Sequence, residues 1–158
     1  MNGENIGDAE STDYLGMVVN GQMFGIPIHR VFDILDSRPL ARVPLSAPAV
    51  RGLINLRGRI VTAIDVRECL GLEPGGGDDE IMHVVIYREE EPYSLVVDKV
   101  TEAWTLKHAD RDPVPMTLDE RWRSVSEGVH RIEDGDEHKL MLMIDVDRLI
   151  DIDALRGR

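Results

Sequence analysis

The feature that most constrains the fold is an internal repeat of the sequence. FGIPIHRVFD (residues 24–33) aligns without a gap on YSLVVDKVTE (residues 93–102), with apolar, basic and acidic types in register. The register continues in two further pairs of segments, Gly52-Leu53 with Gly128-Val129 and Ile64-Asp65-Val66 with Ile144-Asp145-Val146. A repeat of this kind indicates that one supersecondary unit occurs twice. The sequence therefore predicts two structurally similar halves.

The stretch 50–70 predicts the local structure of the first half. Two short β-branched runs flank Arg57-Gly58, a pattern that is typical of a hairpin. Asp65 ends the second run and, with Glu68 three residues later, resembles a capping box for a short helix. Gly71 is suited to end that helix in a left-handed conformation. Strand, turn, strand and helix are expected in this order.

Two further hairpins are predicted. Apolar runs at 14–19 and 23–28 flank Asn20-Gly21, a dipeptide favoured in tight turns because both positions tolerate positive φ. The second half begins with strands at 81–87 and 93–100 that a charged turn joins. Small all-β units usually remove exposed edges by closing into barrels. A mainly β fold is expected.

Other segments are less regular. Residues 30–35 fit one helical turn or an irregular strand equally well, and the polar residues 1–13 are expected to be a disordered lead-in. Residues 109–123 are interpreted as a crossover loop in which Trp122 is either a buried anchor or an exposed contact, and the anchor is favoured because most tryptophans are largely buried. Residues 146–155 predict a short amphipathic helix, whose apolar face comprises Val146, Leu149, Ile150 and Ile152.

The composition argues for protein partners. The net charge of −12 repels nucleic acid and anionic membranes, although solubility alone also accounts for an acidic surface. A nucleic-acid-binding barrel would need a basic face with stacking aromatics, and this chain has two Trp, three Tyr and two Phe. No run reaches the roughly 18 apolar residues of a membrane span, and no secretory signal is apparent. We expect a cytoplasmic protein without direct membrane insertion.

Catalytic residues, metals and cofactors are not expected. The five histidines lack a second ligand at zinc spacing, and the acidic turn between His130 and His138 lacks the alternation of an EF-hand. No GxSxG motif occurs, and Cys69 lies among apolar residues, so a core position is expected for it. An acidic metal-dependent enzyme remains an alternative.

Asp33 and Arg57 stand out as charged residues in apolar neighbourhoods. Each has a simpler interpretation, as a solvated charge and as a hairpin-tip charge. However, the second copy replaces the short NLRG turn with an acidic insert, which favours a task specific to the first copy. We expect Asp33 and Arg57 to lie close together, with Val31 and Ile34 as apolar neighbours of Asp33.

The chain resembles the CheW family of bacterial chemotaxis coupling proteins over about residues 14–151. The resemblance rests on FGIPIHRVFDI, ARVP followed by VRGLINLRGRIVTAIDVR, YSLVVDKV and LMLMIDVDRLI. Similar domains occur in the kinase CheA and in CheV, but this length leaves no room for a kinase, phosphotransfer or receiver segment. A stand-alone coupling protein is therefore expected.

The resemblance implies two intertwined five-stranded barrels, similar to SH3-like barrels, with short helices. It implies one domain over 14–152, with subdomains at about 14–72 and 81–152 that exchange strands, and a tail at 153–158. It also implies a non-enzymatic scaffold that couples the cytoplasmic tips of chemoreceptors to the regulatory domain of CheA. Other CheW-like domains are expected as further partners in rings.

By the same resemblance, Val31, Asp33, Asn55 and Arg57 border the receptor-binding groove. The chain departs from the family pattern at Asp33, at Ser94 and in the long acidic turn 132–138, which leaves receptor choice and ring geometry open. Two alternatives remain: another small acidic β-barrel interaction module, and a CheW-like adaptor of a non-flagellar chemosensory pathway.

Overall fold

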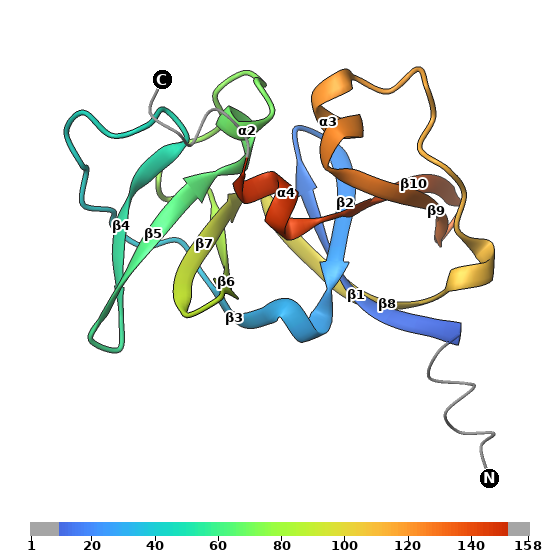
Figure 1. The fold of residues 1–158 in the computed structure, drawn as a ribbon, viewed down its shortest axis with the longest axis horizontal. Helices are drawn as coiled ribbons and strands as arrows, with labels where there is room; N and C mark the ends of the chain where they lie inside the picture. The colour runs from blue at the N-terminus through green and yellow to red at the C-terminus, as the bar shows by residue number, and fades with distance from the viewer. Residues whose placement is uncertain (1–9, 152–158) are drawn as a thin grey trace, which may run out of the picture.

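The computed structural model describes residues 10–151 and contains two five-stranded sheets (Figure 1). Sheet A has the order β8 (Lys99–Lys107), β1 (Ser11–Val19), β2 (Gln22–Pro27), β10 (Glu137–Ile144) and β9 (Ser126–Asp134). Sheet B has the order β3 (Val31–Leu35), β6 (Met82–Arg88), β7 (Glu91–Val97), β5 (Arg59–Asp65) and β4 (Val50–Leu56). The mainly β fold expected from the sequence is confirmed.

The pairing of the strands confirms the duplication. Each sheet contains one parallel pair, β10 with β2 in sheet A and β5 with β7 in sheet B. The paired residues are Leu142 with Phe24 and Met143 with Gly25 in sheet A, and Thr62 with Tyr93 and Ala63 with Ser94 in sheet B. These pairs match under the alignment that places Phe24 on Tyr93. The sequence repeat is therefore a structural repeat.

The two copies exchange strands, since sheet A joins β1 and β2 of the first copy to β8, β9 and β10 of the second. Sheet B comprises β3 to β7 and so occupies the continuous stretch 31–97 between β2 and β8. Each sheet thus draws strands from both sequence copies. The subdomain bounds 14–72 and 81–152 stay predictions.

Each sheet is closed by the segment that follows one of its edge strands. After β3, Ala41 pairs with Leu53 of β4, and after β8, Asp112 pairs with Val129 of β9. A Cβ on Gly52 would lie 2.7 Å from the carbonyl oxygen of Ala41, and one on Gly128 would lie 3.0 Å from that of Asp112. Both glycines of the repeat therefore permit a close approach of two backbones. We call the closed sheets barrel A and barrel B.

Short helices follow the last strand of each copy. In α2 (Val66–Cys69) and α4 (Val146–Ile150), the N-caps Asp65 and Asp145 have φ and ψ of −82° and 108°, and −85° and 108°. The side chain of each aspartate accepts hydrogen bonds from backbone N–H groups of the first turn. The two strand ends are equivalent, as the repeat predicted.

The largest apolar cluster lies between the sheets and contains Phe24, Leu95 and Leu142 together with α2, α4 and α3 (Glu120–Val125). Trp122 of α3 is 6% exposed and its ring lies 5.8 Å from that of Phe24, which confirms the expected anchor. Smaller clusters fill the barrels: Tyr14, Met23, Ile132, Met141 and Met143 in barrel A, and Leu35, Ile54, Leu56, Val61 and Val85 in barrel B.

Several expected boundaries are corrected. β1 begins at Ser11 because Ser11 pairs with Lys107 of β8. The undecided segment 30–35 contains the end of a 3₁₀ turn, η1 (Ile28–Arg30), and then β3. The turn between β6 and β7 is only Glu89-Glu90. The expected crossover loop includes the end of η2 (His108–Asp110) and most of α3. Residues 1–9 and 152–158, and with them the predicted apolar position of Ile152, lie outside the described residues.

Candidate partner-binding surface

Asp33 and Arg57 form an ion pair, with 3.2 Å between Asp33 Oδ2 and Arg57 Nη2. Asp33 lies on β3 and Arg57 at the tip of the β4–β5 hairpin, so the contact joins the two edges of sheet B. The Arg57 side chain is 71% exposed and that of Asp33 only 24%. The predicted proximity is confirmed, and the exposed guanidinium keeps donors available for a partner.

The hairpin turn holds Arg57 in this position. Arg57 and Gly58 have φ of +52° and +87°, values that suit a two-residue turn between right-twisted strands. Asn55 Oδ1 accepts a hydrogen bond of 3.0 Å from the backbone N–H of Gly58. Asn55, which was expected at the groove border, therefore stabilises the turn that presents Arg57.

A β-bulge shapes the opposite side of this surface. Val31 pairs with Ile86 and Asp33 with Val85, so Phe32 is the additional residue. Phe32 and Ile34 are 55% and 42% exposed, and Asp33 Oδ1 accepts a hydrogen bond from the N–H of Ile34. Phe32 and Ile34 thus lie on the exposed face of β3 on either side of Asp33, as the alternation of side chains along a strand places them.

Other side chains extend the surface. The ring of Phe32 lies 5.1 Å from that of Tyr87 in an edge arrangement, and the Arg59 guanidinium carbon lies 5.7 Å from the Tyr87 ring centre. Ile60, next to Arg59, is 60% exposed. We call Phe32, Asp33, Ile34, Arg57 and Ile60 the rim surface. It combines large exposed apolar side chains with one ion pair, a composition typical of a protein contact.

Val31 lies apart from the rim surface. It is half-buried, packs against the core between the sheets, and lines a hollow of about 170 Å³ with His29, Arg30, Phe32 and Tyr87. The structure therefore brings Asp33 and Arg57 into contact, places Asn55 in the turn that carries Arg57, and leaves Val31 packed against the core beside Phe32. Sequence reasoning missed Phe32, Ile60 and Tyr87. The alternation in VFDI hinted at Phe32, but the bulge was not readable from the pattern.

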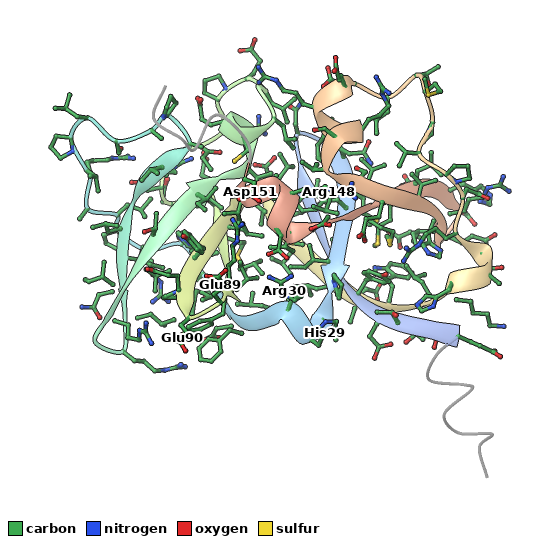
Figure 2. The ribbon with its side chains drawn as sticks, viewed as in Figure 1. His29, Arg30, Glu89, Glu90, Arg148 and Asp151 are labelled. Carbon is green, nitrogen blue, oxygen red and sulfur yellow. The ribbon has the colours of Figure 1, made fainter. Side chains whose placement is uncertain are left out.

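A second polar region lies where the sheets meet. Figure 2 shows His29, Arg30, Glu89, Glu90, Arg148 and Asp151 contributed by η1, the β6–β7 turn and the region of α4. Arg30 Nη2 lies 3.2 Å from Asp147 Oδ1, and Arg88 donates a 3.0 Å hydrogen bond to Asp151. These contacts tie α4 to η1 and to sheet B.

Two buried titratable groups have strongly shifted pKa values. Burial raises the pKa of the Cys69 thiol to about 12, so the expected core position is confirmed and the group stays protonated. Burial also lowers the pKa of His83 to about 4, and its Nδ1 lies 2.7 Å from Ser94 Oγ. Ser94, one of the noted departures, thus gives a buried histidine a polar partner.

Within residues 10–151, no group of three or more His, Cys, Asp or Glu side chains is placed to hold a metal ion. In the same range, no helix has the length and apolar character needed to cross a membrane. What the geometry does present is the rim surface.

The fold and the rim surface define a duplicated β domain with exposed apolar side chains and one ion pair at the edges of sheet B. The model of the CheW-like domain matches residues 13–154, and the chain belongs to this family. A chemotaxis protein CheW of Rhizobium meliloti is 30% identical over 117 residues, which span 73% of this chain and 74% of that protein. Another, from Helicobacter pylori, is 29% identical over 109 residues, 69% of this chain and 66% of that protein.

A solved structure has the same fold. It is the scaffolding protein TtCheW from Thermoanaerobacter tengcongensis, with a TM-score of 0.75 and 21% sequence identity, covering 90% of this chain and 94% of that one. The two intertwined five-stranded units expected from the sequence therefore have a counterpart in an experimental structure.

Proposed function

We propose that this chain is a non-enzymatic scaffold that couples the cytoplasmic tips of chemoreceptors to the regulatory domain of a CheA-type histidine kinase. Membership of the CheW-like family supports a role in chemotaxis. The observation that carries the proposal is the rim surface, where Phe32 and Ile34 flank Asp33 along β3, Ile60 follows the hairpin tip that carries Arg57, and all three apolar side chains are exposed. The protein acts in the cytoplasm and is recruited to receptor arrays, where other CheW-like domains contact it in rings.

The geometry suggests how the surface binds. A receptor helix would bury the apolar side chains, and the ion pair would fix its orientation. Val31, Asp33, Asn55 and Arg57 thus take different parts: Asn55 sets the turn, Asp33 anchors Arg57, and Val31 packs against the core. Loss of one partner of a partly desolvated pair leaves the other uncompensated, at a penalty of about 1 to 3 kcal/mol.

The test is a titration of receptor and CheA binding with charge-reversal variants. Arg57→Glu is expected to weaken receptor binding about five- to hundredfold while its melting temperature stays close to that of the wild type. Asp33→Arg combined with Arg57→Asp should recover part of the loss. Arg131→Glu is the matched control, because Arg131 is 83% exposed but lies on sheet A. Unchanged receptor affinity of folded Arg57→Glu would remove these residues from the binding surface.

The same titrations separate the alternatives. A small acidic interaction module outside chemotaxis would bind neither partner, and capture from lysate followed by mass spectrometry would identify other proteins. An adaptor of a non-flagellar pathway would bind a receptor and a kinase that serve a different output. No nucleic acid is expected to bind, given the net charge of −12.

A further inference from the structure

The duplication provides an internal reference for what the fold requires. At equivalent positions of the two copies, Arg111 of barrel A corresponds to Leu40 of barrel B, and His130 corresponds to Ile54. The closing pairs fix the first correspondence, since Ala41–Leu53 matches Asp112–Val129. The hairpin pairs fix the second, since Ile54 faces Val61 as His130 faces Met141. Polar side chains in barrel A thus stand where barrel B is apolar.

The apolar version is well packed. Ile54 is 2% exposed and belongs to the cluster inside barrel B, against which Leu40 packs. The barrel can therefore be closed with hydrocarbon at both positions. Arginine and histidine at these places in barrel A are not needed to build the fold, and burying them is unfavourable unless they find partners.

Their polar atoms are incompletely satisfied. His130 is 2% exposed, and its Nε2 has no hydrogen-bond partner among the described residues. Arg111 donates from Nη2 to the hydroxyl of Tyr14, but its buried Nε likewise has none there. The Tyr14 and His130 rings lie 6.5 Å apart, so the three side chains form one polar group inside the barrel. Two unused nitrogens at one barrel end indicate an external partner.

A hollow lies beside this group. It has a volume of about 540 Å³ and is lined by His130 together with Lys107, Asp110, Asp112 and Arg131. Burial lowers the pKa of His130, and the nearby charge of Arg111 lowers it further, whereas Asp110 and Asp112 act in the opposite direction. The lining itself contains two cations, Lys107 and Arg131, and two carboxylates, and Arg131 lies 3.8 Å from Asp112. Arg111, which adjoins the hollow through His130 without lining it, adds one further positive charge in a chain whose net charge is −12. The local excess of positive charge favours an anion.

We propose that this end of barrel A binds a small ligand through an oxyanion, a carboxylate or a phosphate, that accepts hydrogen bonds from the Arg111–His130 group. Lys107 attracts the ligand at the mouth. The site lies on sheet A and the rim surface on sheet B, so this proposal does not depend on the proposed function.

The test follows the histidine ring signals of the full chain by NMR during separate titrations with succinate and with inorganic phosphate. Sodium chloride at equal ionic strength is the reference. We expect the His130 signals to shift and saturate with at least one probe and not with the chloride. A response to succinate alone identifies a carboxylate, and a response to phosphate alone identifies a phosphate group.

Two variants replace residues of barrel A with their counterparts from barrel B. Arg111→Leu is expected to weaken binding about ten- to hundredfold, as loss of a charge-assisted hydrogen bond implies. His130→Ile should raise the melting temperature of the free protein. Addition of the probe should then no longer raise it further, as it does for the wild type. His138→Ala, on the exposed tip of the same hairpin, is the control and should bind as the wild type does. If Arg111→Leu does not fold, Lys107→Ala serves in its place with a smaller expected loss.

Three results would overturn the proposal: absence of a saturating shift with both probes, an equal shift with sodium chloride, or wild-type affinity in Arg111→Leu and Lys107→Ala. Loss of binding in the His138→Ala control would also overturn it, because the anion would then be held by the hairpin tip.

Discussion

Arg67 and Asp98 form a forked ion pair, in which Nη2 and Oδ2 are 2.7 Å apart and Nε and Oδ1 are 3.1 Å apart. Asp98 is the single residue between β7 of sheet B and β8 of sheet A. Its carboxylate also accepts a hydrogen bond from the N–H of Asn20 in the β1–β2 turn. One carboxylate thus connects α2, the first hairpin and the crossing between the sheets.

Arg67→Ala is expected to lower the free energy of unfolding by about 1 to 3 kcal/mol, because the half-buried Asp98 carboxylate loses its charged partner. The measurement is urea denaturation of both proteins at neutral pH. Lys139→Ala is the control, since Lys139 forms exposed pairs with Asp134 and Glu137 and should change stability little.

The same contact predicts a pH dependence. Burial alone would raise the pKa of Asp98, but hydrogen bonds from Arg67 and from the Asn20 N–H bring it below its ordinary value of 3.8. A carboxyl whose pKa is lower in the folded state stabilises the protein above the unfolded pKa, and this contribution is lost as pH falls through the folded pKa. Asp98→Asn should therefore show a smaller loss of stability below pH about 4 than the wild type. The prediction would be contradicted if the free energy of unfolding decreased equally with falling pH in Asp98→Asn and in the wild type.

The lowered pKa of His83 predicts a second pH range, above that of Asp98, in which acidification decreases the stability of the protein. Its pKa is about 4 in the folded protein against an ordinary 6.5, so the unfolded chain binds the proton more readily. Stability is then complete above 6.5 and falls by up to about 3 kcal/mol as the pH approaches 4. His83→Gln should flatten the dependence in this window without abolishing it, since the pKa of His130 is also lowered. An NMR titration of His83 checks the value directly.

The loss of stability caused by a Gly→Ala substitution should depend on the space available for the new Cβ atom at that position. Gly52→Ala places a Cβ 2.7 Å from a backbone oxygen and should destabilise most. Gly128→Ala meets the movable Arg111 side chain at 2.7 Å and backbone only at 3.0 Å, so a smaller loss is expected. Gly58→Ala has open space but φ of +87°, which implies about 1 kcal/mol. Thermal melts of the three variants give the order, and a larger effect at Gly58 would refute the packing argument.

Local sequence patterns correctly predicted the features that depend on residues close together in the chain. Asn20-Gly21 and Arg57-Gly58 form the expected hairpin turns, and Asp65 caps the expected helix. The ion pair of Asp33 with Arg57 was also predicted, although its part in binding remains a prediction. These features are encoded within a few residues or in the contrast between the two copies.

Features set by distant strands could not be read in the same way. The repeat alone does not indicate that β1 and β2 complete a sheet with β8 to β10, and only the family resemblance implied the exchange. The bulge at Phe32 and its contact with Tyr87 depend on the register between β3 and β6. The polar end of barrel A likewise becomes visible only when His130 and Arg111 are compared with their counterparts in barrel B.

The order of strands along the chain also bears on how the protein emerges from a ribosome. Sheet B is complete once synthesis reaches Val97, whereas β1 and β2 must wait for β8, β9 and β10. During that delay, Phe24 and the rest of the apolar face between the sheets remain uncovered. Nascent chains halted before β9 are therefore expected to have a formed rim surface and an exposed apolar face. Such chains would be bound by chaperones before they can act as adaptors.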